Sequence, residues 1–592
     1  MAYMQGTPPA NRIHQFKLED FSGGLNNRTE NILPNESANM VNMRYDERTG
    51  FTKRRGTRDY GLSDLPASLE YLDEYKPFRG EDTFVRCTST ALYIGDVKVK
   101  DVDNVVEGEN FQNNYFFTDG TGLYVYGSFP QESSTYMRVE GTPVEGLKLM
   151  HVHTPRADYV PLSTEHMTGV TVYDYNTNRI MYEPCELEMQ DTFKGANVVP
   201  EEAKFVVGHK NRLFISGMRD DDDNVFISDA LNPFYFPVYL PIQMPPNSDV
   251  VRGLVIYDDA VVVGREHDIH AILGGTNRTD AAEPAFTLKR INSHCGFMSN
   301  KCINVAHNYL FFVGSDENTY ALSSANNDVK ILATQLLNQK VDFKKRPLSL
   351  AREHIEDART YFFKDDWYIT VGEIVLVYSY RSQSWSLFNG IGARCFYHKG
   401  EHLLYGRRDG ITGTFSEEYL DFGEPFKAYW ESKTFDMDDP ISFKHFRDFY
   451  LLMHVFEDFV SDIRLKVYID YVEHDLEFTL RSAISLYGVS KWGDLYINQN
   501  VLPSQAISLN RRGRFIRFMI MNSYNPQDTV FAKTDLNTIT ARKFNETLVK
   551  TTQDDKYYLF TRDGWVEKTM IDLNQPLKFY EISGEYEFRK KR

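Results

Sequence analysis

Cysteine is scarce in this sequence and follows no pairing pattern. The 592 residues contain 5 cysteines, an odd number, and no C-x-x-C pair. These features disfavour a disulfide framework and a zinc ribbon. We interpret the cysteines as buried thiols of a protein that folds in a reducing cytoplasm. They are Cys87, Cys185, Cys295, Cys302 and Cys395.

Long hydrophobic runs and long helical patterns are also missing. No stretch approaches the ~20 apolar residues that a membrane-spanning helix needs. The first residues, MAYMQGTPPANRIHQFKLED, show no apolar core of a secretory signal. Only ILATQLLNQKV, residues 331–341, has the spacing of a short helix. We therefore expect no membrane-spanning segment and little helix.

Catalytic and cofactor signatures are absent. The sequence has no G-x-S-x-G elbow, no G-x-x-x-x-G-K-[ST] loop, no H-E-x-x-H and no S-x-D-x-G-x-x-W box. His151 and His153 would share one face of a strand, but no carboxylate or cysteine stands near them at ligand spacing. We read them as surface or hairpin histidines. The expectation is a protein that is not an enzyme, with no catalytic residue, metal or cofactor.

One acidic run stands out, at Asp220, Asp221, Asp222 and Asp223. A calcium loop would alternate its ligands and close on a glutamate, and this run does neither. Repulsion between like charges would instead hold such a loop open in solvent.

Aromatic residues are abundant and suited to strands. They make up 14% of the chain, mostly Phe (41) and Tyr (37), and both types pack well on a pleated sheet. The formal net charge is −17, which disfavours a wide DNA-gripping face but is compatible with DNA that slides past a repulsive wall.

Residues 61–430 repeat one unit, in which two short strands flank a polar turn. It occurs at 83–96, 114–127, 211–229, 258–274, 308–322, 366–380 and 401–415. Most of the spacings lie near the ~40–50 residues of a propeller blade. The pattern predicts an all-β fold with a β-propeller of six to eight blades. The widest spacing predicts an insertion or an extra blade around residues 130–205.

The two ends of the chain differ from this repeat. In DIRLKVYIDY, residues 462–471, apolar and polar residues alternate as in a strand with one wet face. We read 431–592 as a β-sandwich-like domain and 1–60 as an extended leader that is able to complete it. Within the leader, Asn35 could cap a short helix that runs through Met43.

A leader this poor in apolar residues needs a surface to pack on, either its own chain or a neighbouring subunit. Its basic residues Lys53, Arg54 and Arg55 are candidate contacts to another subunit or an adaptor.

The leader resembles a known family. FSGGLN at 21–26, PNE at 34–36, ANMVNM at 38–43 and GFTKRRG at 50–56 are similar to the N-terminal signature of tailed-bacteriophage tail nozzle proteins of the tail tubular protein B type. The stretch 366–390, with Trp385, Phe388 and Gly390, resembles a blade of these proteins. The stretch 425–453 resembles the passage from their last blade to the next domain; its matching residues are Trp430, Lys433, Lys444 and Arg447.

This resemblance implies a structural virion protein in the phage tail, assembled in the cytoplasm of the bacterial host. Such proteins form hexameric rings that extend the portal and adaptor channel, and some gate it. Genomic DNA would pass through the lumen without specific binding, and the acidic loop would face either that lumen or solvent. The implied partners are other copies of the chain, the portal-adaptor ring, and tail fibre or tail-tip proteins.

Two alternatives stay open at this point. One is a phage propeller at the tail tip that binds or cleaves carbohydrate, since aromatic side chains stack on sugar rings. The other is a cellular propeller that serves as a scaffold for protein partners.

Overall fold

The structure, a computed structural model, is built of strands. It describes the following residues: 13–26, 32–46, 50–77, 80–102, 106–112, 114–127, 137–139, 148–152, 169–174, 179–184, 202–218, 221–228, 233, 236, 242–245, 249–274, 286–292, 295–323, 328–331, 357–453, 460–481, 504–522, 525–531, 547–551, 557–561, 564–568, 574 and 576–589. Every regular element among them is a strand except one 3-10 turn, η2 (Asn300–Cys302). The expected all-β class is therefore confirmed. Within these residues no helix is long and apolar enough to cross a membrane.

Seven small sheets follow one another along the middle of the described chain. The first four contain β7 (Leu69–Tyr75), β8 (Thr83–Thr88), β9 (Ala91–Ile94) and β10 (Val97–Asp101); β11 (Glu107–Phe111), β12 (Asn114–Thr118), β13 (Leu123–Gly127), β14 (Met137–Val139) and β15 (Lys148–Val152); β18 (Phe205–His209), β19 (Arg212–Met218), β20 (Asp221–Ile227) and β21 (Ile242–Gln243); and β22 (Val251–Tyr257), β23 (Ala260–Arg265), β24 (Ile269–Gly274) and β25 (Phe286–Asn292). The last three contain β26 (Ile303–Ala306), β27 (Tyr309–Val313), β28 (Thr319–Ser323) and β29 (Asp328–Ile331); β30 (Arg359–Phe363), β31 (Asp366–Val371), β32 (Ile374–Ser379) and β33 (Ser384–Asn389); and β34 (Ala393–Lys399), β35 (His402–Arg407), β36 (Thr412–Phe415), β37 (Leu420–Asp421) and β38 (Glu424–Pro425), joined by β6 (Thr57–Asp59).

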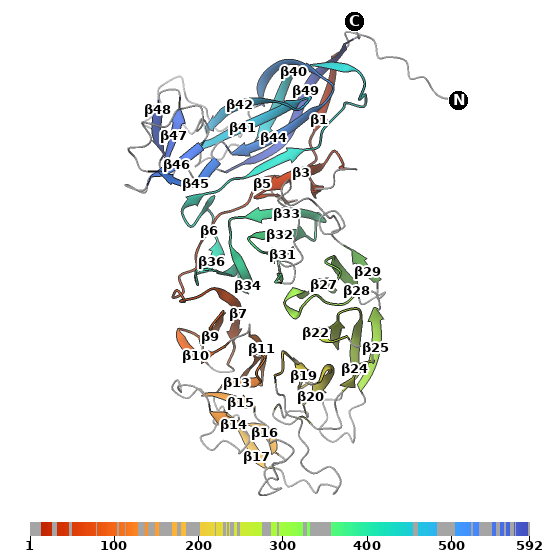
Figure 1. Cartoon of the computed structure of the whole chain (residues 1–592), viewed down its shortest axis with the longest axis vertical. Coiled ribbons are helices and arrows are strands. Elements are labelled where there is room, and N and C mark those ends of the chain that lie inside the picture. The colour runs from red at the N-terminus through yellow and green to blue at the C-terminus, as the bar shows by residue number, and fades with distance from the viewer. Residues whose placement is uncertain are drawn as a thin grey trace, which may run out of the picture.

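The first strands of these sheets contact one another in a closed circuit. β7 contacts β11, and the contacts continue through β18, β22, β26, β30 and β34 back to β7. Figure 1 shows the resulting ring below a separate pair of sheets. The fold of this part is β-propeller-like: each small sheet buries its two faces against its neighbours.

All seven hairpins predicted from the repeat are confirmed. Each is the antiparallel pair formed by the second and third strands of one sheet, from β8–β9 to β35–β36. In three of the sheets the preceding turn, between the first and second strands, holds two residues with positive φ. They are Lys210 and Asn211, Asp258 and Asp259, and His307 and Asn308. This backbone matches the right-handed twist of the strands that it joins.

The stretch 130–205 adds strands to the second sheet and one separate hairpin. β14 and β15 extend the second sheet beyond β13, while β16 (Gly169–Asp174) and β17 (Arg179–Pro184) form a two-stranded sheet of their own. The helix expected at 331–341 lies outside the described residues beyond Ile331, which ends β29.

The seventh sheet is completed by the leader. β6 pairs antiparallel with β36, with Asp59 opposite Gly413 and Thr57 opposite Phe415. The ring is thus closed by pairing of strands that lie more than 350 positions apart in the sequence.

Two six-stranded sheets stand beside the ring, and the leader contributes to both. One contains β1 (Ile13–Leu18), β4 (Met43–Asp46), β5 (Gly50–Lys53), β40 (Phe443–Met453), β43 (Ser504–Gly513) and β49 (Lys578–Arg589). The other contains β2 (Gly24–Leu25), β3 (Glu36–Val41), β39 (Tyr429–Ser432), β41 (Val460–Ile469), β42 (Val472–Arg481) and β44 (Ile516–Asn522). A further sheet contains β45 (Asn525–Phe531), β46 (Thr547–Thr551), β47 (Tyr557–Thr561) and β48 (Gly564–Lys568).

The two six-stranded sheets pack face to face as a sandwich. Phe449 of β40 packs against Phe518 of β44 with ring centroids 5.4 Å apart. The apolar face of the alternation predicted for 462–471 is confirmed from Ile463 to Ile469, whose apolar residues are buried; on the face predicted to be wet, Arg464 is buried as well, at 6% exposure. Tyr471 departs from it: it lies in the turn that follows and is 82% exposed.

The helix predicted from Asn35 is wrong. The segment is instead strand β3, which pairs with β2 on one side and β39 on the other. Two neighbouring strands offer its backbone more hydrogen bonds than an isolated helical turn could, so tertiary pairing overrides local preference. Asn42, with φ 56°, ends the strand.

The sandwich and the ring share one continuous core. The same buried cluster contains Phe21 and Phe51 of the leader, Trp430 of the sandwich, and Trp367 and Trp385 of the sixth sheet. The leader therefore packs on its own chain, which is the first of the two surfaces that the sequence left open for it.

Candidate functional site: a basic cleft between leader and ring

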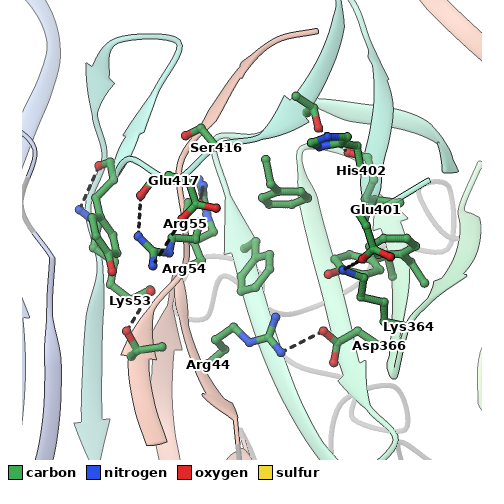
Figure 2. A pocket seen from close by; sticks show the side chains of 18 of the residues that line it. Arg44, Lys53, Arg54, Arg55, Lys364, Asp366, Glu401, His402, Ser416 and Glu417 are labelled. Carbon is green, nitrogen blue, oxygen red and sulfur yellow. Dashed lines mark hydrogen bonds and ion pairs between the residues drawn. The ribbon is translucent and has the colours of Figure 1, made fainter. Parts of the chain in front are cut away.

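A recess lies where the leader crosses the sixth and seventh sheets. It has a volume of about 930 Å³. One wall comes from the leader, through residues 52–55 and Arg58. The other comes from the sixth and seventh sheets and includes Lys364, in the turn before β31, and His402, at the start of β35 (Figure 2). The start of β49 contributes Lys578.

Basic residues outnumber acidic ones in this cleft, against the balance of the whole chain. Eight lining residues are Lys or Arg and five are Asp or Glu, an excess of three basic residues (8 − 5) on a protein of net charge −17. The basic residues are Arg44, Lys53, Arg54, Arg55, Arg58, Lys364, Arg381 and Lys578. The acidic ones are Asp365, Asp366, Glu401, Glu417 and Glu418.

Several of these charges pair within the cleft. Nη2 of Arg44 lies 2.9 Å from Oδ2 of Asp366, and Nε of Arg381 lies 2.6 Å from Oδ2 of Asp365. Arg44 belongs to β4 and Asp366 to β31, so this ion pair joins the leader to the sixth sheet.

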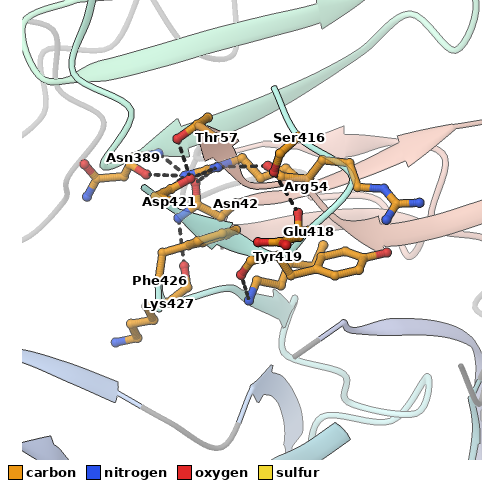
Figure 3. Close-up of polar contacts among 12 residues, drawn as sticks. Asn42, Arg54, Thr57, Asn389, Ser416, Glu418, Tyr419, Asp421, Phe426 and Lys427 are labelled. Carbon is orange, nitrogen blue, oxygen red and sulfur yellow. Dashed lines mark hydrogen bonds and ion pairs between the residues drawn. The ribbon is translucent and has the colours of Figure 1, made fainter. Parts of the chain in front are cut away.

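Arg54 is the best-connected cation, and it points away from the cleft into the protein. Its guanidinium donates to both carboxylate oxygens of Asp421, at 2.8 and 2.5 Å (Figure 3). It also donates to the Asn42 side chain at 2.8 Å and to the Asn389 carbonyl at 3.1 Å. Its carbon Cζ lies 3.9 Å from the centroid of the Phe426 ring.

This arrangement satisfies a charge that is almost completely buried. Arg54 is only 1% exposed, and a bidentate carboxylate partner suits the fork of its guanidinium. Thr57 donates a further hydrogen bond to Asp421 at 2.9 Å. Arg54 therefore fastens the leader to the seventh sheet.

Lys53 is buried beside Arg54. Its Nζ lies 4.1 Å from the centroid of the Phe426 ring and 3.5 Å from the Tyr419 carbonyl oxygen. Burial, assisted by the charge of Arg54, lowers the pKa of Lys53 to about 7. Near neutral pH this amine is therefore close to the midpoint of its titration.

The three basic residues that were candidates for subunit contacts differ in how exposed they are. Lys53 and Arg54 are buried within their own chain, at 2% and 1% exposure. The side chain of Arg55 is 49% exposed, so it is the one of the three with surface left for another subunit. Arg58 and Lys578 were missed by the sequence analysis; nothing in the local pattern shows that β49 returns to the leader.

The acidic run and the histidine pair are only partly described. Asp221, Asp222 and Asp223 begin strand β20, with Asp221 opposite Met218. His151 lies in β15. Asp220 and His153 are outside the described residues.

No metal-binding group is found among the described residues, and their cysteines are buried. No set of three His, Cys, Asp or Glu side chains there could hold a metal ion. Burial raises the pKa of Cys87 and Cys395 to about 12 and that of Cys302 to about 11. These thiols stay protonated near neutral pH, as expected of structural cysteines.

The central part of the ring is crossed by a side-chain hydrogen bond. Asn300, just before β26, donates a hydrogen bond to Glu107 of β11. Arg359 of β30 reaches past β34 to Glu70 of β7, with 3.0 Å between Nη2 and Oε2. Glu107 and Asn300 belong to sheets that are separated by at least two others in the ring, so their hydrogen bond crosses its central part, whereas the ion pair of Arg359 with Glu70 skips a single sheet.

Glu107 makes stability depend on pH. Burial raises its pKa to about 7, although Lys301, Asn300 and Arg359 act in the opposite direction. Between about pH 4.5 and 7 the unfolded chain loses this proton while the folded chain keeps it, so stability falls as pH rises through that window. We expect Glu107→Gln to remove this loss of stability. The free energy of unfolding should rise by up to about 3 kcal/mol at pH 8 and should hardly change at pH 4.5.

Urea unfolding at the two pH values measures this difference. Glu417→Gln is the matched control, because the Glu417 side chain is 98% exposed. An equal gain at both pH values for Glu107→Gln would contradict the assignment.

Comparisons with known proteins show only distant structural likeness. No family model matches the chain, and no curated protein matches its sequence. A computationally designed protein, Ika8, aligns over 60% of this chain and 98% of its own, with 11% identity and a TM-score of 0.31. The WD40 domain of Neurospora crassa Pan2 aligns over 64% of this chain and 98% of its own, with 7% identity and a TM-score of 0.32.

A third structure matches more of this chain. It is the extracellular domain of the putative hybrid two-component system BT4673 from B. thetaiotaomicron, with 6% identity and a TM-score of 0.34. The alignment covers 88% of this chain but 53% of that one, so the chain spans about half of its length. At such scores the matches carry no argument about this chain.

Proposed function

We propose that this chain is a structural virion protein of a tailed bacteriophage, a tail nozzle or head-tail ring component through which genomic DNA passes. The observation that carries the proposal is the role of the leader, whose sequence bears the family resemblance. Phe21, Leu25, Met40, Met43 and Phe51 all lie in the shared core. The resemblance thus falls on residues that hold the architecture together.

The proposal also specifies the architecture of the chain. We take the seven sheets as the blades of a seven-bladed β-propeller, closed by the leader strand β6, with the sandwich as a second domain. Three parts follow: a leader, a propeller and a β-sandwich. The leader is shared between the other two parts.

DNA would run between copies of the chain and not through the propeller. The hydrogen bond between Asn300 and Glu107 crosses the central part of the propeller, and the ion pair of Arg359 with Glu70 joins two further innermost strands that are not adjacent. A duplex needs a far wider opening, which a ring of six copies would supply. The net charge of −17 favours a lumen that repels phosphate, so DNA slides without specific binding.

The partners of such a ring are the portal-adaptor ring on one side and tail fibre or tail-tip proteins on the other. Its location is the tail of the virion, after assembly in the bacterial cytoplasm. The role is mechanical, possible gating of DNA included, and it involves no catalysis or cofactor.

Mass measurement and negative-stain microscopy of the purified protein test this proposal, both alone and mixed with the connector proteins of its phage. We expect a hexameric ring with a central hole, formed alone or on the connector. A monomer that persists in both conditions would contradict the proposal. Binding of that monomer on a glycan array would support the carbohydrate alternative instead.

A further inference from the structure

We propose that the basic cleft receives a short acidic polypeptide segment from a neighbouring copy of this chain. The inference rests on the proposed ring, because it assigns one half of the contact between subunits. It extends the expectation from the sequence, which named three contiguous basic residues, to a recess built from the leader, the ring and β49.

The cleft holds positive charges that its own walls do not neutralise. Arg58 is exposed, and neither it nor Lys578 forms an ion pair with a described residue. Arg55 is half-exposed, and its only acidic partner among the described residues is Glu417, 3.8 Å away and 98% exposed. An exposed pair of this kind contributes at most about 1 kcal/mol, so Arg55 can exchange it for a better acceptor.

The floor of the cleft strengthens the attraction for an anion. Lys53 is 2% exposed and is flanked by the rings of Tyr419 and Phe426. Charges interact more strongly in such poorly hydrated surroundings than in water. A carboxylate at the floor would also favour the protonated amine, so binding should be accompanied by proton uptake near neutral pH.

The distribution of charge favours a peptide over a nucleic acid. The acidic residues lie among the cations of the lining: Glu401 pairs with Lys364, Glu417 with Arg55 and Asp365 with Arg381. A continuous phosphate backbone would meet these carboxylates, whereas a peptide can place its few acidic side chains between them. A volume of about 930 Å³ suits a few residues and no large ligand.

A second copy of the chain is a suitable source for that segment. The sequence has 83 acidic and 66 basic residues, so a neighbour carries a net charge of −17, opposite in sign to the excess in the cleft. A closed ring requires one patch to meet a different patch on the next subunit. A basic recess that faces an acidic exterior meets this requirement.

Fluorescence anisotropy with a labelled hexaglutamate peptide tests the inference at low salt, on full-length protein diluted until sedimentation shows a monomer whose cleft no neighbour fills. We expect Arg58→Glu with Lys578→Glu to weaken binding at least tenfold. The control is Lys98→Glu with Arg408→Glu, two exposed residues outside the cleft that give the same change in net charge. It should change binding less than twofold. Thermal melting verifies that each variant folds, and Arg58→Gln with Lys578→Gln, a milder pair, should give an intermediate loss.

Three results would overturn the inference: no binding of hexaglutamate to the wild type, equal losses for cleft and control variants, or tighter binding of a labelled hexathymidylate that the cleft variant abolishes. The last would assign the cleft to nucleic acid. Sedimentation at higher concentration separates failure of the cleft inference from failure of the proposed function. If the wild type forms rings but its dilute monomer does not bind the peptide, only the cleft inference fails. If the monomer binds the peptide but never forms rings, the proposed function fails.

Discussion

Asp421→Ala should lower the free energy of unfolding by about 3–5 kcal/mol, the usual effect of leaving a buried charge without its partner. Asp421 supplies two acceptors to the guanidinium of Arg54, which is 1% exposed. Without that carboxylate, the positive charge stays between the leader and the seventh sheet with no counter-ion. Urea denaturation followed by tryptophan fluorescence measures the loss, because Trp367, Trp385 and Trp430 lie in the shared core.

Two further variants make this measurement specific. Arg54→Met combined with Asp421→Leu removes both charges and should recover most of the loss, since apolar residues of similar size replace buried ion pairs well. Glu373→Ala breaks the pair with Arg408, whose side chains are 60% and 58% exposed, and should cost at most about 1 kcal/mol. A loss for Asp421→Ala as small as that of the surface variant would show that the buried pair does not fasten the leader.

Gly56→Ala should destabilise the closure of the ring by about 3 kcal/mol. A Cβ atom at this position would lie 2.0 Å from the carbonyl oxygen of Leu420, and the other close atoms also belong to the backbone of Leu420. Backbone cannot rotate away as a side chain can, so β6 and β37 would have to separate. Hydrogen exchange should show faster exchange of the β36 amides, together with a lower melting temperature.

Gly392→Ala is the matched control for this steric effect. Gly392 has φ +64° and nothing lies within 4 Å of its added Cβ, so it should cost only the strain of a left-handed alanine, about 1 kcal/mol. Its effect should not reach the β36 amides. If the two variants destabilise the protein equally and leave those amides protected, the close approach of Gly56 is not what holds the seventh sheet.

The repeated hairpins could be predicted from the sequence, because each is a local structure. Alternating aromatic and β-branched residues around a polar turn determine both the strands and their pairing, as in Tyr309–Val313 and Thr319–Ser323. The alternation of Ile463 to Ile469 similarly marked the buried face of a sandwich strand.

Pairings between distant parts of the chain could not be predicted in this way. The residues from Glu36 to Val41 contain nothing that reveals β39 as a partner, so their local preference suggested a helix. The cleft was missed for the same reason. The cleft forms because Lys578 and Arg58 line the same recess and because Arg54 turns inward to Asp421. Both arrangements depend on contacts between residues that lie hundreds of positions apart in the sequence.

The pairing of β1 with β49 has a consequence for how the protein is made. Ile13 lies opposite Glu587, so the first described strand emerges from the ribosome long before its partner exists. At about 5–20 residues per second, the wait lasts roughly half a minute to two minutes. Throughout that time the leader strands present unpaired edges, which invite association between nascent chains. Translation that stops before β49 would therefore release a chain whose sandwich lacks a strand between β5 and β40, and we expect such fragments to aggregate.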